Sequence, residues 1–184
     1  MLERYLIQHC SPTLASLKTA NLFTFLYSDK KKLIGSIVKW NQMMGRKGIS
    51  MTVLQMNSRY ALIYVYRFSR LKEDLEKPGV WEFLQSCGYD KLEEQRLFIH
   101  LRKRLKEAGE FPHEIGLFLG YPLGDVLGFI EHEGKDYAFK GYWKVYKNPD
   151  DTMQMFEKFK KWDCEKTRLS FFAAPFLHLL CING

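Results

Sequence analysis

Two β-rich runs separated by only three residues constrain the fold of this chain more than any other feature. Residues 49–56 and 60–66 are rich in β-branched and aromatic side chains, and Asn57, Ser58 and Arg59 lie between them. A connection this short joins antiparallel neighbours, whereas a parallel pair needs a crossover of about a dozen residues or more. The sequence therefore predicts an antiparallel hairpin within its sheet.

Further strands and helices are predicted on both sides of the hairpin. We expect strands at 22–27, 115–119 and 137–146, the last with a bulge at Gly141. Helices are expected at 2–9, from Ser11-Pro12 onward, at 30–46, 68–77, 80–87, 91–108 and 122–131, and from Asn148-Pro149 onward. Each strand–helix–strand stretch predicts a right-handed crossover and a parallel pair of strands.

These elements predict the fold class α/β (α+β mixed): a mixed sheet of about five strands flanked by helices. The 184 residues, 46% hydrophobic and 15% aromatic, suit one domain spanning 1–184. We expect its core to contain residues 22–26, Val53, Ile63, Val65, Leu117 and Leu119. An apolar tail at 169–184 is predicted to be buried or to dock on a partner.

The tail and the cysteines bear on where the protein works. The apolar run of the tail contains Pro175 and His178 and is shorter than the ~20 residues of a spanning helix, so we expect no membrane span. No secretory signal is recognised at the N-terminus, which favours a cytoplasmic location. The four cysteines, Cys10, Cys87, Cys164 and Cys181, form no CxxC pair, and we expect reduced thiols and no metal site.

A strand–turn–helix segment at residues 111–130 is the main candidate for a functional site. We expect Gly116, Gly120, Tyr121 and Pro122 to line a pocket where the helix N-terminus presents free N–H groups to a phosphate or carboxylate. The alternative is a tight turn in which the glycines serve only backbone geometry, since neither GxGxxG nor a P-loop motif is present.

Three residues are candidates for catalysis. His113 and Glu114 precede the predicted strand, and one of them could act as a general base or a metal ligand, although capping and surface roles are commoner. Cys10 stands at a predicted helix N-terminus, where a thiolate is stabilised, with a small buried residue as the alternative.

The formal charge of +7 permits an acidic partner, and lysines interleave the aromatic residues of 137–146. Lys140 and Lys144 are therefore candidate ligand-binding residues beside the turn. The same alternation resembles a base-stacking platform for nucleic acid, but it is also what an inward-facing strand needs, and nucleic-acid binding is the less favoured interpretation.

The segments HCSPTLASLKTANLF (9–23), HEIGLFLGYPLGDVLGFI (113–130) and GYWKVY (141–146), with a terminal helix ending KKWDC, resemble a bacterial family known only as domain of unknown function 3793. The resemblance covers residues 2–168. It implies a small stand-alone protein, transfers no catalytic residues or cofactor, and suggests a link to redox or iron metabolism. Gly124 and the very apolar tail depart from the family pattern.

Three functions follow as hypotheses. The first is a small-molecule binding protein or enzyme that accepts an anionic ligand or cofactor at 116–123. The second is a non-catalytic accessory protein that docks on a redox or iron-handling protein partner. The third is a weak nucleic-acid binder. The residues assign neither a reaction nor a cofactor.

Overall fold

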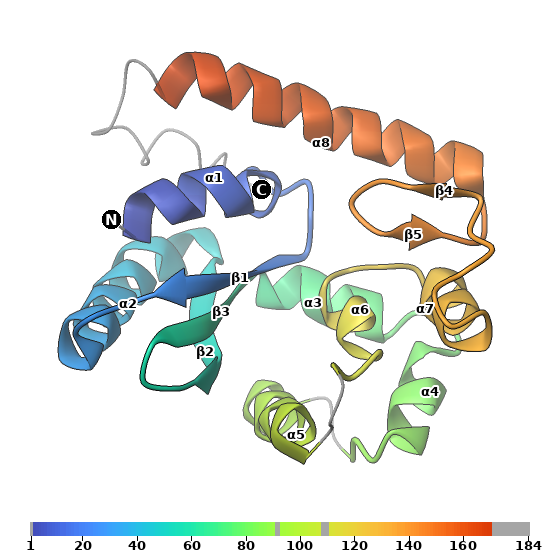
Figure 1. The fold of residues 1–184 in the computed structure, drawn as a ribbon, viewed down its shortest axis with the longest axis horizontal. Coiled ribbons are helices and arrows are strands. Elements are labelled where there is room, and N and C mark those ends of the chain that lie inside the picture. The colour runs from blue at the N-terminus through green and yellow to red at the C-terminus, as the bar shows by residue number, and fades with distance from the viewer. Residues whose placement is uncertain (1, 91–92, 108–110, 171–184) are drawn as a thin grey trace.

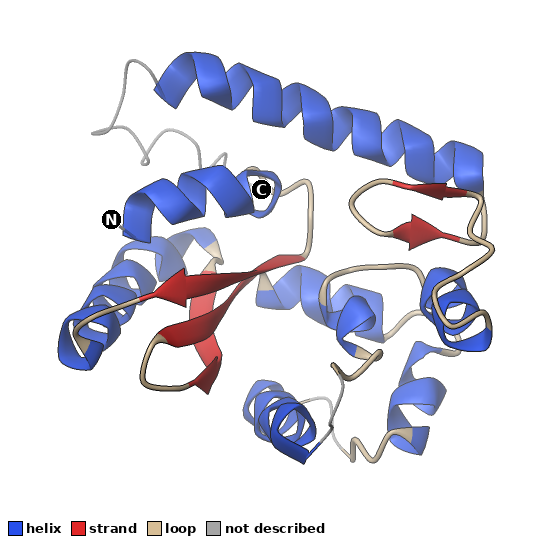
Figure 2. Cartoon of the chain, in the orientation of Figure 1, coloured by secondary structure: helices blue, strands red, loops and turns tan. Residues whose placement is uncertain are grey.

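A computed structural model describes residues 2–90, 93–107 and 111–170, with side chains described to residue 162. Eight α-helices and five strands occur in this part of the chain (Figures 1 and 2). In chain order they are α1 (Leu2–Leu14), β1 (Ala20–Leu26), α2 (Lys30–Met44), the short 3-10 helix η1 (Gly45–Lys47), β2 (Ser50–Met56), β3 (Tyr60–Tyr66), α3 (Phe68–Leu75), α4 (Val80–Ser86), α5 (Glu94–Glu107), α6 (Ile115–Phe118), α7 (Leu123–Glu131), β4 (Phe139–Lys140), β5 (Lys144–Val145) and α8 (Pro149–Ser170). The hypotheses about Cys164, Cys181 and the tail at 169–184 fall outside the described side chains.

The predicted hairpin is confirmed, and its second strand is the centre of a three-stranded antiparallel sheet. β3 lies between β1 and β2, with Tyr66 opposite both Ala20 and Ser50. β1 and β2 therefore run parallel to each other without pairing, in a split βαβ arrangement whose crossover is α2. The prediction of a parallel pair is wrong because the hairpin strand occupies the position between them.

Side-chain alternation along β3 divides the core into two clusters. Ala61, Ile63 and Val65 point to one face, where they pack with α1 and α2. Tyr64 and Tyr66 point to the opposite face, where they pack with α3 to α6. Successive strand residues point to opposite faces, so a strand buried on both faces reads as a continuous apolar run. This explains why β3 has almost no polar residue.

The N-terminus forms one helix instead of the two that were predicted. α1 continues through Ser11 and Pro12 to Leu14. A proline in the last turn removes a single backbone donor, and the Ser11 hydroxyl donates to the Ile7 carbonyl at 2.6 Å in the same turn. The chain then reaches β1 through residues 15–19.

The predicted strand at 115–119 is wrong, because this segment forms the short helix α6. The Gly116 and Leu117 amides donate to the His113 and Glu114 carbonyls, three residues earlier. Gly120 follows the helix with φ +78°, and the Tyr121 amide donates back to the Gly116 carbonyl at 2.9 Å. This is a Schellman motif, in which glycine takes the left-handed position after a helix.

The predicted long strand at 137–146 is a hairpin of two short strands. β4 pairs with β5, Phe139 opposite Val145, and Gly141 lies in the turn between them. A Cβ at Gly141 would lie 2.3 Å from the ring of Phe156 in α8, so this turn reverses directly against the helix. The described residues thus form a three-stranded and a two-stranded sheet, and the expected five-stranded sheet is not present among them.

The remaining helix, α8, joins the two halves of the molecule. Figure 1 shows it running along α1 at one end and over the β4–β5 hairpin at the other. Its Phe156 and Phe159 pack with Trp143 and Val145 in a third, smaller cluster. The hairpin is consequently held from one side by α8 and is free to line a pocket on its other side.

Most of the expected core is buried. Phe23, Ile63, Val65 and Leu117 are buried, and so is Leu119, although it belongs to the end of a helix and not to a strand. Leu22 and Val53 are half-buried. Leu26 was placed in the core wrongly: it is 64% exposed, because it is the last residue of an edge strand and points away from α1.

Candidate functional site

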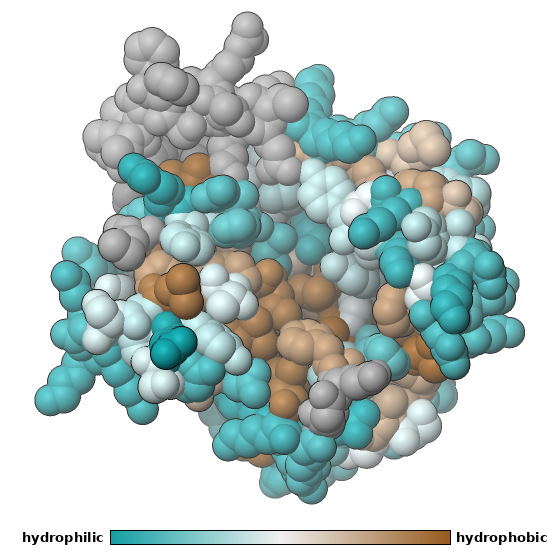
Figure 3. Space-filling model, in the orientation of Figure 1, coloured by the Kyte–Doolittle hydropathy of each residue, from teal (hydrophilic) through white to brown (hydrophobic). Residues whose placement is uncertain are grey.

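A pocket of about 520 Å³ opens between α6, α7 and the β4–β5 hairpin. Its walls combine aromatic side chains with a few polar ones: Phe111, Pro112, His113, Ile115, Gly116, Tyr121, Asp125, Val126, Phe129, Lys140, Gly141, Tyr142, Trp143 and Lys144. Figure 3 shows one face of the molecule, with apolar side chains reaching the surface near its middle and hydrophilic side chains around them. A concave, mostly apolar pocket with a few convergent polar groups is the usual form of a small-molecule site.

The structure brings five of the predicted site residues together in this pocket. His113, Gly116, Tyr121, Lys140 and Lys144 all line it. Gly116 is needed for close packing: a Cβ there would lie 2.9 Å from Val126 and 3.1 Å from the Tyr121 ring. The glycine therefore lets α6 approach Val126 of α7 and lets the Tyr121 ring pack against the backbone of α6.

The aromatic wall is built from two ring contacts. Tyr121 stacks on Trp143 with 4.6 Å between ring centroids, and His113 lies 5.3 Å from the ring of Phe129. Burial raises the pKa of the Tyr121 hydroxyl to about 12, so this group is neutral at physiological pH. The wall offers flat, polarisable surfaces to a ligand.

The two predicted lysines differ in what they can do. The ammonium of Lys144 donates to the Gly134 carbonyl at 2.6 Å and lies over the rings of Tyr137 and Phe129. Lys140 is exposed at the pocket edge, and its ammonium group has no hydrogen bond or ion pair with any described residue. Lys144 thus holds the wall together, and Lys140 is available to an anion.

Asp125 is the polar group most firmly fixed in the pocket wall. Its buried carboxylate accepts hydrogen bonds from Trp143 Nε1 at 2.8 Å and from the backbone amides of Tyr146 and Lys147 at 2.7 and 2.9 Å. It lies in the first turn of α7 and so attaches that helix to β5 and the residues after it. Both oxygens of its carboxylate are engaged, so Asp125 holds Trp143 and the end of the hairpin in place against α7.

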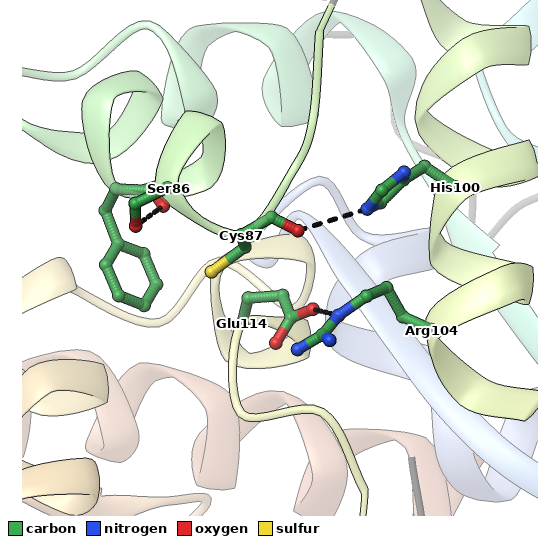
Figure 4. A network of polar contacts seen from close by, with 6 residues as sticks. Ser86, Cys87, His100, Arg104 and Glu114 are labelled. Atoms are coloured by element: carbon green, nitrogen blue, oxygen red, sulfur yellow. Dashed lines mark hydrogen bonds and ion pairs between the residues drawn. The ribbon is translucent and has the colours of Figure 1, made fainter. Parts of the chain in front are cut away.

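Glu114 does not enter the pocket, although it neighbours His113. It is 2% exposed, and its carboxylate accepts from Arg104 Nε at 2.7 Å (Figure 4). In the same network His100 contacts the Cys87 carbonyl at 3.2 Å. These contacts connect α4, α5 and the start of α6, and they engage the Glu114 carboxylate in an ion pair outside the pocket.

Cys10 is buried and Cys87 is half-buried, and neither forms a disulfide. Cys10 packs in the cluster between α1, α2 and the sheet, away from the pocket residues. Burial, followed by the charge of Glu114, raises the pKa of the Cys87 thiol. A raised pKa lowers the thiolate fraction, which makes Cys87 a poor nucleophile at neutral pH.

The other two predicted residues, Gly120 and Pro122, line a second pocket that shares Tyr121 and Trp143 with the first. Gly120 is closely approached by the protein itself, because a Cβ there would lie 2.7 Å from the Thr19 hydroxyl. Within the described residues no group of three His, Cys, Asp or Glu side chains could hold a metal ion. Nor is any helix there long and apolar enough to cross a membrane.

Comparison with known proteins gives one match. A family model described as protein of unknown function (DUF3793) matches residues 6–174. The chain belongs to this family. No curated protein and no solved structure matches it. The DUF3793 match covers nearly the stretch expected from the sequence, including α6, α7 and the hairpin, so both pockets lie within the family region.

Sequence reasoning missed Asp125, Trp143 and Lys18, which the structure places in the walls of the two pockets. An acidic residue in the first turn of a helix is expected to satisfy the amides of that helix, whereas Asp125 accepts from Trp143, Tyr146 and Lys147. The sequence therefore carries no signal for its role in the wall. Gly124, which departs from the expected family pattern, fits locally: a Cβ there would lie 2.8 Å from the Lys147 side chain.

Proposed function

We propose that this member of the DUF3793 family binds a small organic anion with a flat aromatic body in the pocket between α6, α7 and the hairpin. The observation that carries the proposal is the pairing of an aromatic wall with an uncommitted lysine. Tyr121, Trp143 and Phe129 line the interior, and Lys140 lies at the edge. Nucleotides and flavins have the chemistry that such a pocket accepts.

The size of the pocket supports this class of ligand. About 520 Å³ lies within the range of roughly 300–1,000 Å³ that is typical of small-molecule sites. A planar ring can stack on the aromatic wall while its charged group reaches Lys140, and His113 is a second hydrogen-bond donor in the lining.

Binding without catalysis is the better supported activity. Of the titratable groups that line the pocket, Asp125 is fully hydrogen-bonded and Lys144 is held by Gly134. Lys140 is exposed at the pocket edge, and the neighbour of His113, Glu114, points away into an ion pair. General acid–base catalysis needs positioned partners, and among the described side chains His113 has none that could orient it.

The test is titration of the purified protein with flavin mononucleotide and adenosine monophosphate, followed by calorimetry and by tryptophan fluorescence, since Trp143 is in the wall. We expect saturable binding. The affinity should fall about tenfold in Lys140→Ala, because this substitution removes one charge-assisted contact. Lys135→Ala removes an exposed lysine outside the pocket and should leave the affinity unchanged. Equal affinities in wild type and Lys140→Ala, or no saturable binding by either compound, would refute the proposal.

A further inference from the structure

A second pocket, of about 380 Å³, lies where the segment before β1 meets α3, the turn after α6 and α8. Lys18 and Thr19 contribute to its wall from the first of these segments, and Asp74 contributes from α3. Nothing in the sequence had singled out Lys18. Its burial and its small number of partners are the observations that point to a ligand.

Lys18 is only 7% exposed, yet its ammonium group is incompletely partnered. Lys18 Nζ donates to the Ala20 carbonyl at 2.7 Å and lies 5.5 Å from the centroid of the Tyr121 ring. An ammonium group has three donors, and no carboxylate in the described part of the chain forms an ion pair with this one. A buried charge without a counter-ion is costly, so the site favours an incoming anion.

The acidic residue of the pocket does not neutralise Lys18, because it is engaged elsewhere. The Asp74 carboxylate accepts from the Thr19 hydroxyl and forms an ion pair with Lys77 Nζ at 2.5 Å. Arg70 also lines the pocket, so three cationic side chains face one carboxylate there. The balance of charge in the wall is positive.

The rest of the wall is largely aliphatic and faces the same space. It includes Leu17, Val80, Leu117, Leu123 and Met155, with Phe159 and the shared Tyr121 and Trp143. A ligand that satisfies both parts of the wall has a charged head and an apolar body. Lys18 is the buried ammonium of this wall, and its one positive charge matches the single negative charge of a monocarboxylate.

We propose that this second pocket binds an aliphatic monocarboxylate, with the carboxylate at Lys18 Nζ and the hydrocarbon chain against Leu117, Leu123 and Met155. The site differs from the one for an aromatic anion, since Lys140 and Phe129 are absent from its wall. The two proposals therefore stand or fall separately.

The probe is hexanoate, with hexanamide as its uncharged isostere, titrated into the full-length protein by calorimetry and by NMR. We expect hexanoate to bind in the millimolar range or tighter and hexanamide to bind at least tenfold more weakly. Lys18→Met should lower the hexanoate affinity at least tenfold. Lys72→Met, the same change at an exposed lysine of α3 outside the pocket, should have no effect, and neither should Lys140→Ala.

A pH titration of the wild-type protein tests the same site without a substitution. Burial lowers the pKa of Lys18 to about 8, against a smaller opposite effect of Cys10. The hexanoate affinity should therefore fall about tenfold between pH 7 and 9, as Lys18 loses its proton. The other titratable groups facing Lys18 are Cys10 in α1, Arg70 and Asp74 in α3, Lys77, and Tyr121.

The profile should persist in Cys10→Ala, which excludes the thiol as its source. Hexanoate binding that is independent of pH between 7 and 9, an unchanged affinity in folded Lys18→Met, or hexanamide binding as tight as that of hexanoate would each overturn the proposal. The absence of any hexanoate binding at a concentration of about 10 mM would also overturn it.

Discussion

Asp125 and Glu114 are the two buried carboxylates nearest the first pocket, and each is fixed by different partners. Asp125 accepts one side-chain and two backbone donors, whereas Glu114 accepts the guanidinium of Arg104. Removing one partner of a buried hydrogen bond costs the desolvation of the group left behind, about 1–3 kcal/mol and more for a charge. Substitutions at both positions should therefore act on stability.

Asp125→Asn should lower the free energy of unfolding by about 2–3 kcal/mol, because an amide nitrogen cannot accept the bonds that a carboxylate oxygen accepts. Urea denaturation monitored by circular dichroism measures the change. Asp136→Asn alters an exposed carboxylate by the same chemistry and should cost less than about 0.5 kcal/mol. A loss at Asp125 no larger than the loss at Asp136 would contradict the role given to the buried carboxylate.

Glu114→Gln should separate a structural role from a catalytic or binding one. The change leaves the Arg104 guanidinium without its charged acceptor and should cost about 1–3 kcal/mol in unfolding free energy. The affinity for flavin mononucleotide, measured on the folded variant, should stay within twofold of wild type. A large loss of affinity with unchanged stability would show that Glu114 takes part in ligand binding.

At the level of elements, the sequence predicts α2 to α5, α7 and the strands β1 to β3 within a few residues, although not the sheet that these strands form. It fails at 115–119 because a five-residue apolar run suits a buried strand and a buried helix equally well. The glycine at 120 with Pro122 two residues later is a helix-end signal that favours the helix. It fails again at 137–146, where the close contact between Gly141 and Phe156 of α8 imposes a reversal that no local pattern announces.

The candidate pocket was partly predictable, because some of its residues are close together in the sequence. His113, Gly116 and Tyr121 are close in sequence, and the turn that joins them was recognised although its helix was not. Lys140 and Lys144 reach the same pocket only because the chain reverses at Gly141 and Asp125 holds the hairpin to α7. Lys18 lies about a hundred residues from that turn, and sequence distance alone hides such a contact.

Two helix glycines should respond in opposite directions to the same substitution. A Cβ at Gly128 of α7 would lie 2.5 Å from the Tyr146 ring, so Gly128→Ala should destabilise the protein by about 1–3 kcal/mol. Gly35 of α2 has nothing within 4 Å, and Gly35→Ala should add about 0.5–1 kcal/mol through helix propensity. Thermal and urea unfolding give both values, and two changes of the same sign would contradict the packing described for α7.

For the molecule as a whole, Lys18 links folding to pH. Its pKa is about 8 in the folded protein, below its ordinary value of 10.5, so between these values the unfolded chain carries a proton that the folded one has lost. Stability from this group therefore rises with pH across that window, by about 1.4 kcal/mol per unit above pH 8. Buried tyrosines act in the opposite direction above pH 10, since burial raises the pKa of Tyr64 and Tyr121.

Comparison with Lys18→Met isolates the lysine, because both proteins contain the same tyrosines. The difference in unfolding free energy, wild type minus variant, should be constant from pH 6 to 7.5 and should rise between pH 8 and 10. Urea denaturation at each pH measures it. Parallel stability curves over the whole range would show that Lys18 titrates normally.

The central place of β3 also sets the order in which the sheet can assemble. β1 and β2 leave the ribosome first but have no hydrogen-bonding neighbour until residues 60–66 follow. The hairpin closes a three-residue loop, whereas β1 must wait for a partner about 40 positions downstream, with α2 formed in between. Short loops close faster than long ones. A nascent chain should therefore pair β2 with β3 first and admit β1, with α1 attached, as the last strand.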